Sequence, residues 1–165
     1  MRDAVLMELT DTAQGRAGEP GELTVGQVVS SEAARARAAQ IDELLGGTRI
    51  YDGPATEGLR QAFDECDLVV SHLAIGATTR ILAPLLDSKK TDPGVVVIDQ
   101  GGHFVVPLLG GHVGGANELA EKLSEALGAT AVLTTATEQH PACAEARKNC
   151  GVACATPTIP RRSSR

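Results

Sequence analysis

The chain has 165 residues, the length of about one domain, and fifteen Lys and Arg against twenty-one Asp and Glu give it a net charge of −6. Hydrophobic residues make up 42% and charged residues 22%, a balance that fits neither a largely disordered chain nor a membrane protein. The acidic charge disfavours a general binder of nucleic-acid phosphates, and the scarcity of aromatic residues (2%) disfavours a base-stacking surface.

The first part of the chain predicts a strand, a loop and a helix. Residues 5–9 are a short apolar run, and residues 15–22, with one proline and three glycines, indicate a loop. A helix of about a dozen residues is expected to begin after Ser30 or Ser31 as N-cap and to end at Gly46-Gly47. Its apolar residues recur at helical spacing: Ala34, Ala38, Ile41 and Leu45.

Two strands and a second helix follow. Residues 48–51 predict a strand, and Asp52-Gly53-Pro54 precedes a short helix that ends near Asp64. This helix has an apolar face of three residues: Leu59, Ala62 and Phe63. Residues 68–73 predict the next strand.

The middle of the chain predicts a short helix and a hairpin. Gly76 is expected to end a strand, Thr78 to cap a short helix, and Pro84 to limit that helix. Residues 95–98 are four consecutive β-branched residues, typical of a strand covered on both faces. Residues 104–106 follow closely enough to pair with them as a hairpin.

The strongest helical pattern lies after the hairpin. Apolar residues at i, i+3, i+4, i+7 and i+11 from Ala116 predict a helix that stops at Gly128, and residues 132–135 predict a following strand. Because strands and helices alternate, we expect an α/β fold: a small layered sheet, at least partly parallel, with helices on its faces. We expect residues 1–137 to form this domain and residues 138–165 to be a disordered tail.

The cysteines and the N-terminus bear on the compartment. Three of the four cysteines, Cys143, Cys150 and Cys154, lie in the predicted tail, and their spacing matches no CxxC zinc pair. A metal site that includes His140 is the alternative to reduced, structurally incidental thiols. Glu8 interrupts the N-terminus before a signal-peptide apolar stretch is complete, so we expect a cytoplasmic protein without membrane contact.

Four glycines surround one histidine between the predicted hairpin and the following helix. The stretch from Gly110 to Asn117 reads Gly-Gly-His-Val-Gly-Gly-Ala-Asn. Glycines allow close approach of a ligand, and a helix start offers N–H groups to an anion or an oxyanion. No Gly-Lys-Ser/Thr ends this loop, and His112 stands where a dinucleotide fingerprint has its second glycine, so nucleotide binding is disfavoured.

His112 is the candidate catalytic residue in this loop. Its ordinary pKa suits proton transfer at neutral pH, although capping of the helix is an equally good interpretation. His72 and His103 lack such a setting, and we expect them to be structural or surface residues. Asp99 follows the apolar strand, where ligands bind in open α/β sheets, but turn initiation explains it equally well.

Three cations precede the glycine loop in this acidic chain: Arg80, Lys89 and Lys90. They are either a solvated charged face or a patch that receives carboxylates or phosphates.

Residues 74–138 closely resemble the N-terminal and central part of the CbiG family of cobalamin-biosynthesis proteins, the cobalt-precorrin-5A hydrolases. Two motifs carry the resemblance: Gly-His-x-Gly-Gly-Ala-Asn over residues 111–117 and Lys-x-x-Asp-Pro over residues 89–93. Residues 1–73 match only in general layout.

The resemblance implies chemistry on a cobalt-containing, ring-contracted tetrapyrrole. A δ-lactone is opened, acetaldehyde leaves, and cobalt-precorrin-5B is formed, with the cobalt carried by the substrate and no cofactor or metal site in the protein. Arg80, Lys89 and Lys90 are then expected to bind substrate carboxylates, together with Gly111, Gly114 and Gly115 of the loop. His112 and Asn117 are the expected catalytic residues, since they lie where a water and the acyl oxyanion need support.

The chain also departs from the family pattern. Gly110, Thr79 and Glu138 stand where the family usually has Ser, Val and Asp, and the family's C-terminal domain does not follow. The forms with Gly110 resemble proteins in which this module is fused to a precorrin methyltransferase. We therefore expect either a fragment or a partner, a C-terminal CbiG domain or such a methyltransferase, and the alternative function is a non-catalytic corrinoid-binding module.

Overall fold

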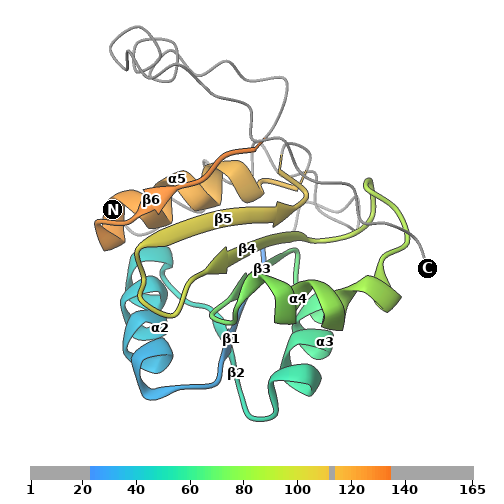
Figure 1. Cartoon of the computed structure of the whole chain (residues 1–165), viewed down its shortest axis with the longest axis horizontal. Helices are drawn as coiled ribbons and strands as arrows, with labels where there is room; N and C mark the ends of the chain where they lie inside the picture. The colour runs from blue at the N-terminus through green and yellow to red at the C-terminus, as the bar shows by residue number, and fades with distance from the viewer. Residues whose placement is uncertain (1–22, 112–113, 135–165) are drawn as a thin grey trace, which may run out of the picture. The chain divides into compact units, whose positions relative to one another are not determined.

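A six-stranded sheet with helices on both faces forms the core of the structure (Figure 1). The computed structural model describes residues 23–111 and 114–134, and the sheet order is β2-β1-β3-β4-β5-β6. The strands are β1 Val25–Val29, β2 Arg49–Asp52, β3 Leu68–Ser71, β4 Gly94–Ile98, β5 Phe104–Leu109 and β6 Thr130–Ala131. The helices are α2 Glu32–Leu45, α3 Ala55–Glu65, α4 Ile75–Leu82, the 3₁₀ helix η1 Ala83–Leu85, and α5 Ala116–Leu127.

The sheet is mixed, because β5 reverses the chain direction. Strands β2, β1, β3 and β4 are mutually parallel, whereas β5 runs antiparallel to β4 and β6 runs parallel to β5. The α/β class, the partly parallel sheet and the hairpin formed by β4 and β5 are thus confirmed.

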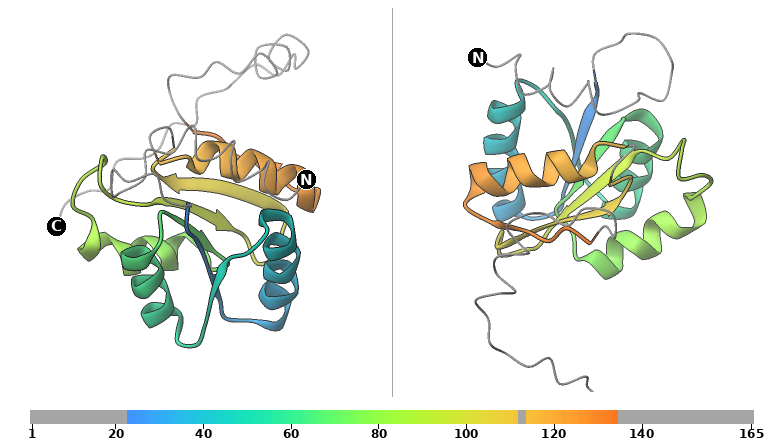
Figure 2. Two further views of the ribbon diagram at one scale, coloured as in Figure 1. Left: turned by 180° about the vertical axis from the view of Figure 1, so that it is seen from behind. Right: turned by 90° about the horizontal axis from the view of Figure 1, so that it is seen from above.

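Alternate residues of each strand enter opposite layers of the core. Val70 and Val96 pack with residues of α2 and α5 on one face, while Val69 and Val95 pack with residues of α3 and α4 on the other. Figure 2 shows the two pairs of helices on either side of the strands. All five residues of β4 are buried, as expected for a strand covered on both faces.

The two long helices begin and end where the sequence indicates. The Ser31 hydroxyl accepts a hydrogen bond from the backbone N–H of Ala34, and Gly46 ends α2 in the left-handed region with φ of 81°. Gly128 ends α5 in the same way, with φ of 64°. The apolar stripes of both helices are buried.

Strand β1 was not predicted from the sequence. The apolar run at residues 5–9, the loop at 15–22 and the tail at 138–165 lie outside the described residues. The described sheet instead places β1 between β2 and β3, with all five residues buried. Gly26 and Gln27 interrupt the apolar residues of this strand, so its sequence does not show the apolar pattern expected of a buried strand.

Two further predictions were wrong in detail. Gly76 does not end a strand and Thr78 does not cap a helix, because α4 begins at Ile75 and contains both residues. Thr78 is buried inside the helix, where its hydroxyl lies 2.8 Å from that of Ser71. The last described strand, β6, consists of Thr130–Ala131 rather than residues 132–135, although Val132 still donates a backbone hydrogen bond to Val105.

Candidate functional site

The glycine loop joins the end of β5 to the start of α5. Because β5 is antiparallel to β4, this loop lies beside the first residue of β4, at the amino edge of the parallel strands. A Cβ atom on Gly110 would lie 2.9 Å from the Cα atom of Gly94, and one on Gly114 would lie 2.8 Å from the carbonyl oxygen of Gly110. Close backbone packing therefore requires glycine at these positions.

Backbone hydrogen bonds hold the described part of this loop. Gly110 accepts from the N–H groups of Gly114 (3.0 Å) and Ala116 (3.2 Å), and Gly111 accepts from Asn117 (3.0 Å). Three N–H groups at or near the helix start thus already have acceptors. Gly115, the N-cap, has φ of 71°, in the left-handed region that favours glycine.

Of the two predicted catalytic residues, the structure places one. Asn117 lies in the first turn of α5 and is only 4% exposed. A Cβ atom on Gly111 would lie 2.8 Å from Asn117 Oδ1, so the amide packs directly against the loop. His112 lies outside the described residues, between Gly111 and Gly114. Its two predicted roles therefore stay predictions.

The three predicted cations lie on two separate segments. Lys89 and Lys90 are exposed in the turn before β4, which begins at the same sheet edge as the glycine loop. Arg80 belongs to α4, and its Nη1 donates to the carbonyl oxygen of Gly76 (2.8 Å) in the first turn of that helix. That turn follows β3, at the carboxyl edge of the sheet. The lysines and the Arg80 guanidinium therefore belong to opposite edges.

A pocket of about 550 Å³ lies at the carboxyl edge, where the sequence suggested a ligand only through Asp99. Its walls come from the segments after β1, β3 and β4 and from strand β5, and they include Ser30, His72, Asp99 and Phe104. With a rise of about 3.3 Å per residue, β4 separates this pocket from the glycine loop by roughly 16 Å. The chain thus has two candidate regions rather than one.

His72 belongs to a buried polar network below this pocket. Its Nε2 lies 3.1 Å from Oε1 of Gln27, a residue of β1 that is fully buried. Burial, together with the nearby Arg37 charge, lowers the pKa of His72 from 6.5 to about 4. The imidazole is therefore neutral at neutral pH. A structural role for His72 agrees with the sequence, but the part played by Gln27 was missed.

Asp99 organises the turn between β4 and β5. Its two carboxylate oxygens accept hydrogen bonds from the backbone N–H groups of Phe104 (2.7 Å) and Gly101 (3.0 Å). Slight burial raises the pKa of Asp99, but backbone hydrogen bonds from Phe104, Gly101 and His103 outweigh it, and the pKa is lowered. The turn interpretation of Asp99 is confirmed, and His103 is a surface residue as expected.

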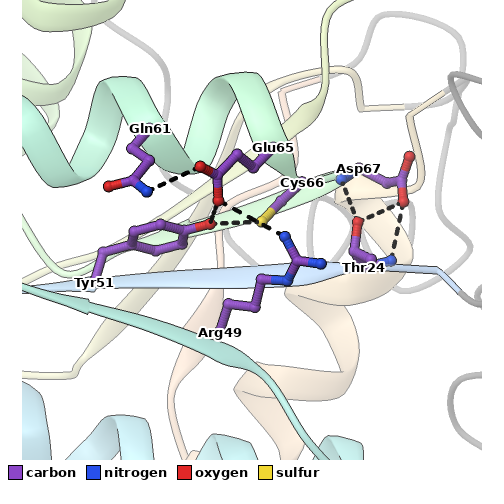
Figure 3. Close-up of polar contacts among 7 residues, drawn as sticks. All are labelled: Thr24, Arg49, Tyr51, Gln61, Glu65, Cys66 and Asp67. Carbon is purple, nitrogen blue, oxygen red and sulfur yellow. Dashed lines mark hydrogen bonds and ion pairs between the residues drawn. The ribbon is translucent and has the colours of Figure 1, made fainter.

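A third polar cluster links β2 to the end of α3 (Figure 3). The Tyr51 hydroxyl lies 2.9 Å from Glu65 Oε2 and 3.4 Å from Cys66 Sγ. Burial is the main cause that raises the pKa of both Tyr51 and Cys66. Cys66 is a free, buried thiol, and its raised pKa makes it a poor nucleophile.

Residues 23–111 and 114–134 contain no group of three or more His, Cys, Asp or Glu side chains suited to hold a metal ion. In the same part of the chain, no helix has the length and apolar character needed to cross a bilayer.

Comparison with known proteins identifies the region around the glycine loop. Residues 57–138 match the family model described as cobalamin synthesis G N-terminal, CbiG_N. This part of the chain belongs to the CbiG N-terminal family. The CbiG region begins within α3 and includes Arg80, Lys89, Lys90 and every predicted loop residue, but neither β1 nor Gln27.

Two curated relatives match more than half of this chain. The cobalt-precorrin-5A hydrolase of Salmonella typhimurium is 47% identical over 88 residues, which are 53% of this chain and 25% of the relative. The protein of the same name from Priestia megaterium is 40% identical over 97 residues, which are 59% of this chain and 26% of the relative. The matched part of the chain thus spans about a quarter of the length of either relative.

A solved structure supports the fold. A crystal structure of a cobalamin biosynthesis protein G homolog from Sulfolobus solfataricus superposes with a TM-score of 0.57 and 28% sequence identity. The match covers 67% of this chain and 36% of that protein. The α/β sheet described above is therefore shared with a CbiG homologue.

Proposed function

We propose that this chain takes part in cobalamin biosynthesis, in the hydrolysis of cobalt-precorrin-5A. The observation that carries the proposal is the 47% identity to a cobalt-precorrin-5A hydrolase, supported by the family match over residues 57–138. The substrate class is an anionic cobalt corrin precursor whose lactone is opened with loss of acetaldehyde. The cobalt belongs to this substrate, and we propose no cofactor for the protein itself.

We assign the reaction to the amino edge, where the glycine loop lies. In this proposal His112 removes a proton from the attacking water, and Asn117 and the start of α5 support the acyl oxyanion. Because the N–H groups of Gly114, Ala116 and Asn117 already donate to loop carbonyls, any of these three that donates to the oxyanion must exchange its present bond. Substrate bound at Gly111, Gly114 and Gly115 would offer a new acceptor in place of the loop carbonyl.

The exposed lysines at this edge suit the carboxylates of the substrate. Lys89 and Lys90 precede β4 beside the loop, so they can bind acetate or propionate groups of a ring seated there. Arg80 stays a candidate for carboxylates that reach the carboxyl edge, since its guanidinium lies against the first turn of α4. The contribution of Arg80 to substrate affinity can therefore be measured separately from that of the lysines.

A non-catalytic corrinoid-binding module is the second candidate function. The observation that favours it is length, because the matched part of the chain corresponds to about a quarter of each curated relative. In that case turnover needs a partner, which we propose to be a C-terminal CbiG domain or a precorrin methyltransferase. Nucleic acid and membranes are not proposed partners.

Titration of the chain with cobalt-precorrin-5A, followed by the absorbance of the ring, tests both candidates at once. We expect saturable binding that weakens as salt rises, because exposed charges are screened within about 10 Å at 0.1 M salt. Acetaldehyde release in the same samples separates the hydrolase from the binding module. The absence of binding at low salt would refute both.

A further inference from the structure

We propose that the pocket at the carboxyl edge is a second ligand site, in which Nδ1 of His72 accepts a hydrogen bond from a hydroxyl or N–H group on an uncharged, apolar ligand. This site is separate from the glycine loop and goes beyond the proposed hydrolysis. It rests on three features of the pocket: a fixed tautomer, an unmet acceptor and an apolar wall.

The hydrogen-bond network assigns the tautomer of His72. Nε2 of Gln27 lies 2.9 Å from the carbonyl oxygen of Ala38, which only accepts, and 2.8 Å from the hydroxyl of Thr48. The Gln27 amide is therefore oriented with Oε1 toward His72, where it accepts from Nε2–H at 3.1 Å. A neutral imidazole with its proton on Nε2 has a lone pair on Nδ1.

Nδ1 of His72 has no hydrogen-bond partner among the described residues. His72 is 4% exposed, and its Nδ1 atom is buried while the residue lines the pocket. A buried acceptor without a donor destabilises the protein, because its hydration is lost and not replaced. A ligand that supplies an N–H or O–H group at Nδ1 would remove this penalty. Since Nδ1 is an acceptor, the ligand must be the donor.

The walls of the pocket select an apolar body. Its lining includes Ile75, Phe104 and Val132, which are 43%, 50% and 37% exposed. Across the described part of the chain these are three of the five large hydrophobic side chains that remain exposed. Exposed apolar residues gathered around one concave site are typical of a binding site.

A carboxylate ligand does not suit the unmet acceptor of this pocket. Asp99 lines the pocket, and its pKa is lowered by backbone hydrogen bonds, so it is ionised at neutral pH. Arg37 donates to the carbonyl oxygens of Asp99 (3.4 Å) and Gln100 (3.0 Å) and partly offsets that charge, but an ionised carboxylate has no proton to donate to Nδ1 of His72. An alcohol hydroxyl or an amide N–H supplies a donor proton without carrying a charge.

Three probes with the same ring test the proposal on the full chain. Cyclohexanol has the donor, methoxycyclohexane has the same body without it, and cyclohexanecarboxylate replaces the donor with a charge. We expect cyclohexanol to bind about tenfold more tightly than either of the others, measured by chemical-shift titration. Its saturation should also move the ¹⁵N resonance of His72 Nδ1 in the direction of hydrogen-bond acceptance. Equal affinities, tighter carboxylate binding or an unmoved Nδ1 resonance would overturn the proposal.

A variant isolates the acceptor from the rest of the network. In His72→Gln the side-chain amide can still donate to Gln27, but no acceptor remains at the Nδ1 position. We expect the preference for cyclohexanol over methoxycyclohexane to disappear in this variant, and an unchanged preference would contradict the assignment. If the variant does not fold, the Nδ1 resonance of the unaltered chain decides alone. None of these measurements involves a corrinoid, so their failure leaves the proposed hydrolysis untouched.

Discussion

Gly94 at the start of β4 and Gly114 in the glycine loop pack backbone against backbone: a Cβ atom on Gly94 would lie 2.5 Å from the carbonyl oxygen of Gly114. The same hypothetical atom would lie 2.6 Å from a methyl group of buried Leu68. Part of the glycine content of the loop is thus explained by packing against β4.

Gly94→Ala should lower the free energy of unfolding by about 1–3 kcal/mol, because the added methyl group overpacks a site closed by backbone. Urea denaturation measures the change. Gly53→Ala is the matched control, since Gly53 is exposed and no heavy atom lies within 4 Å of its Cβ position. Equal stability of the two variants would contradict the packing described for Gly94 and Gly114.

Because His72 is buried and neutral, we expect the folded chain to lose stability in acid. Its pKa is about 4 in the folded chain, whereas the ordinary histidine pKa of 6.5 applies to the unfolded chain. Between these values the unfolded state binds more protons, so stability rises with pH and falls as pH drops from about 6.5 to 4. The His72 contribution to this loss is about 3 kcal/mol at most. His72→Gln should show a flatter profile over this range, measured by urea denaturation at each pH, and parallel profiles would contradict the prediction.

His112→Ala separates catalysis from capping. If His112 activates water, turnover should fall by roughly 10²–10⁴-fold while corrinoid affinity changes little. If it only caps the loop or the helix, the change should be about 1 kcal/mol of stability with turnover preserved. Acetaldehyde release and urea denaturation on the same samples distinguish the two results.

The lysines should contribute more to corrinoid affinity than Arg80. Each lysine that makes a charge-assisted hydrogen bond to the substrate should weaken binding about tenfold or more when replaced by alanine. Arg80→Ala should weaken it less, because its guanidinium is directed to Gly76 at the other edge. Arg49→Ala, an exposed cation on the edge strand β2, is the charge control. If the variant with both Lys89 and Lys90 replaced by alanine binds the corrinoid as tightly as Arg49→Ala does, this assignment is contradicted.

Much of the fold could be predicted because its elements carry local signals. The period and caps of α2 and α5 and the β-branched run of β4 are readable without tertiary information. Strand β1 was missed since Gln27 looks polar in sequence, whereas its amide is satisfied by Ala38 and Thr48 from elsewhere in the fold. The start of helix α4 was not predictable because its N-cap residue, Ala74, has no side chain that can cap the helix.

The sequence predicts the glycine loop of the candidate site but not the position of this loop in the fold. The glycine loop was found through its composition, but its position depends on β5 running antiparallel to β4, which places it away from the carboxyl edge. Asp99 and the pocket therefore lie at the opposite edge of the sheet, the carboxyl edge. The unmet acceptor on His72 depends on Gln27, 45 residues earlier in the chain, and no local pattern indicates such a pair.

A chimera tests the central claim most directly. Residues 57–138 of this chain would replace the matching segment of the Salmonella typhimurium cobalt-precorrin-5A hydrolase, and acetaldehyde release from cobalt-precorrin-5A would be measured. The account predicts that the folded chimera releases acetaldehyde and that His112→Ala within it lowers the rate at least about a hundredfold. A folded chimera that releases no acetaldehyde, or one whose rate is unchanged by His112→Ala, would contradict the catalytic assignment of this loop.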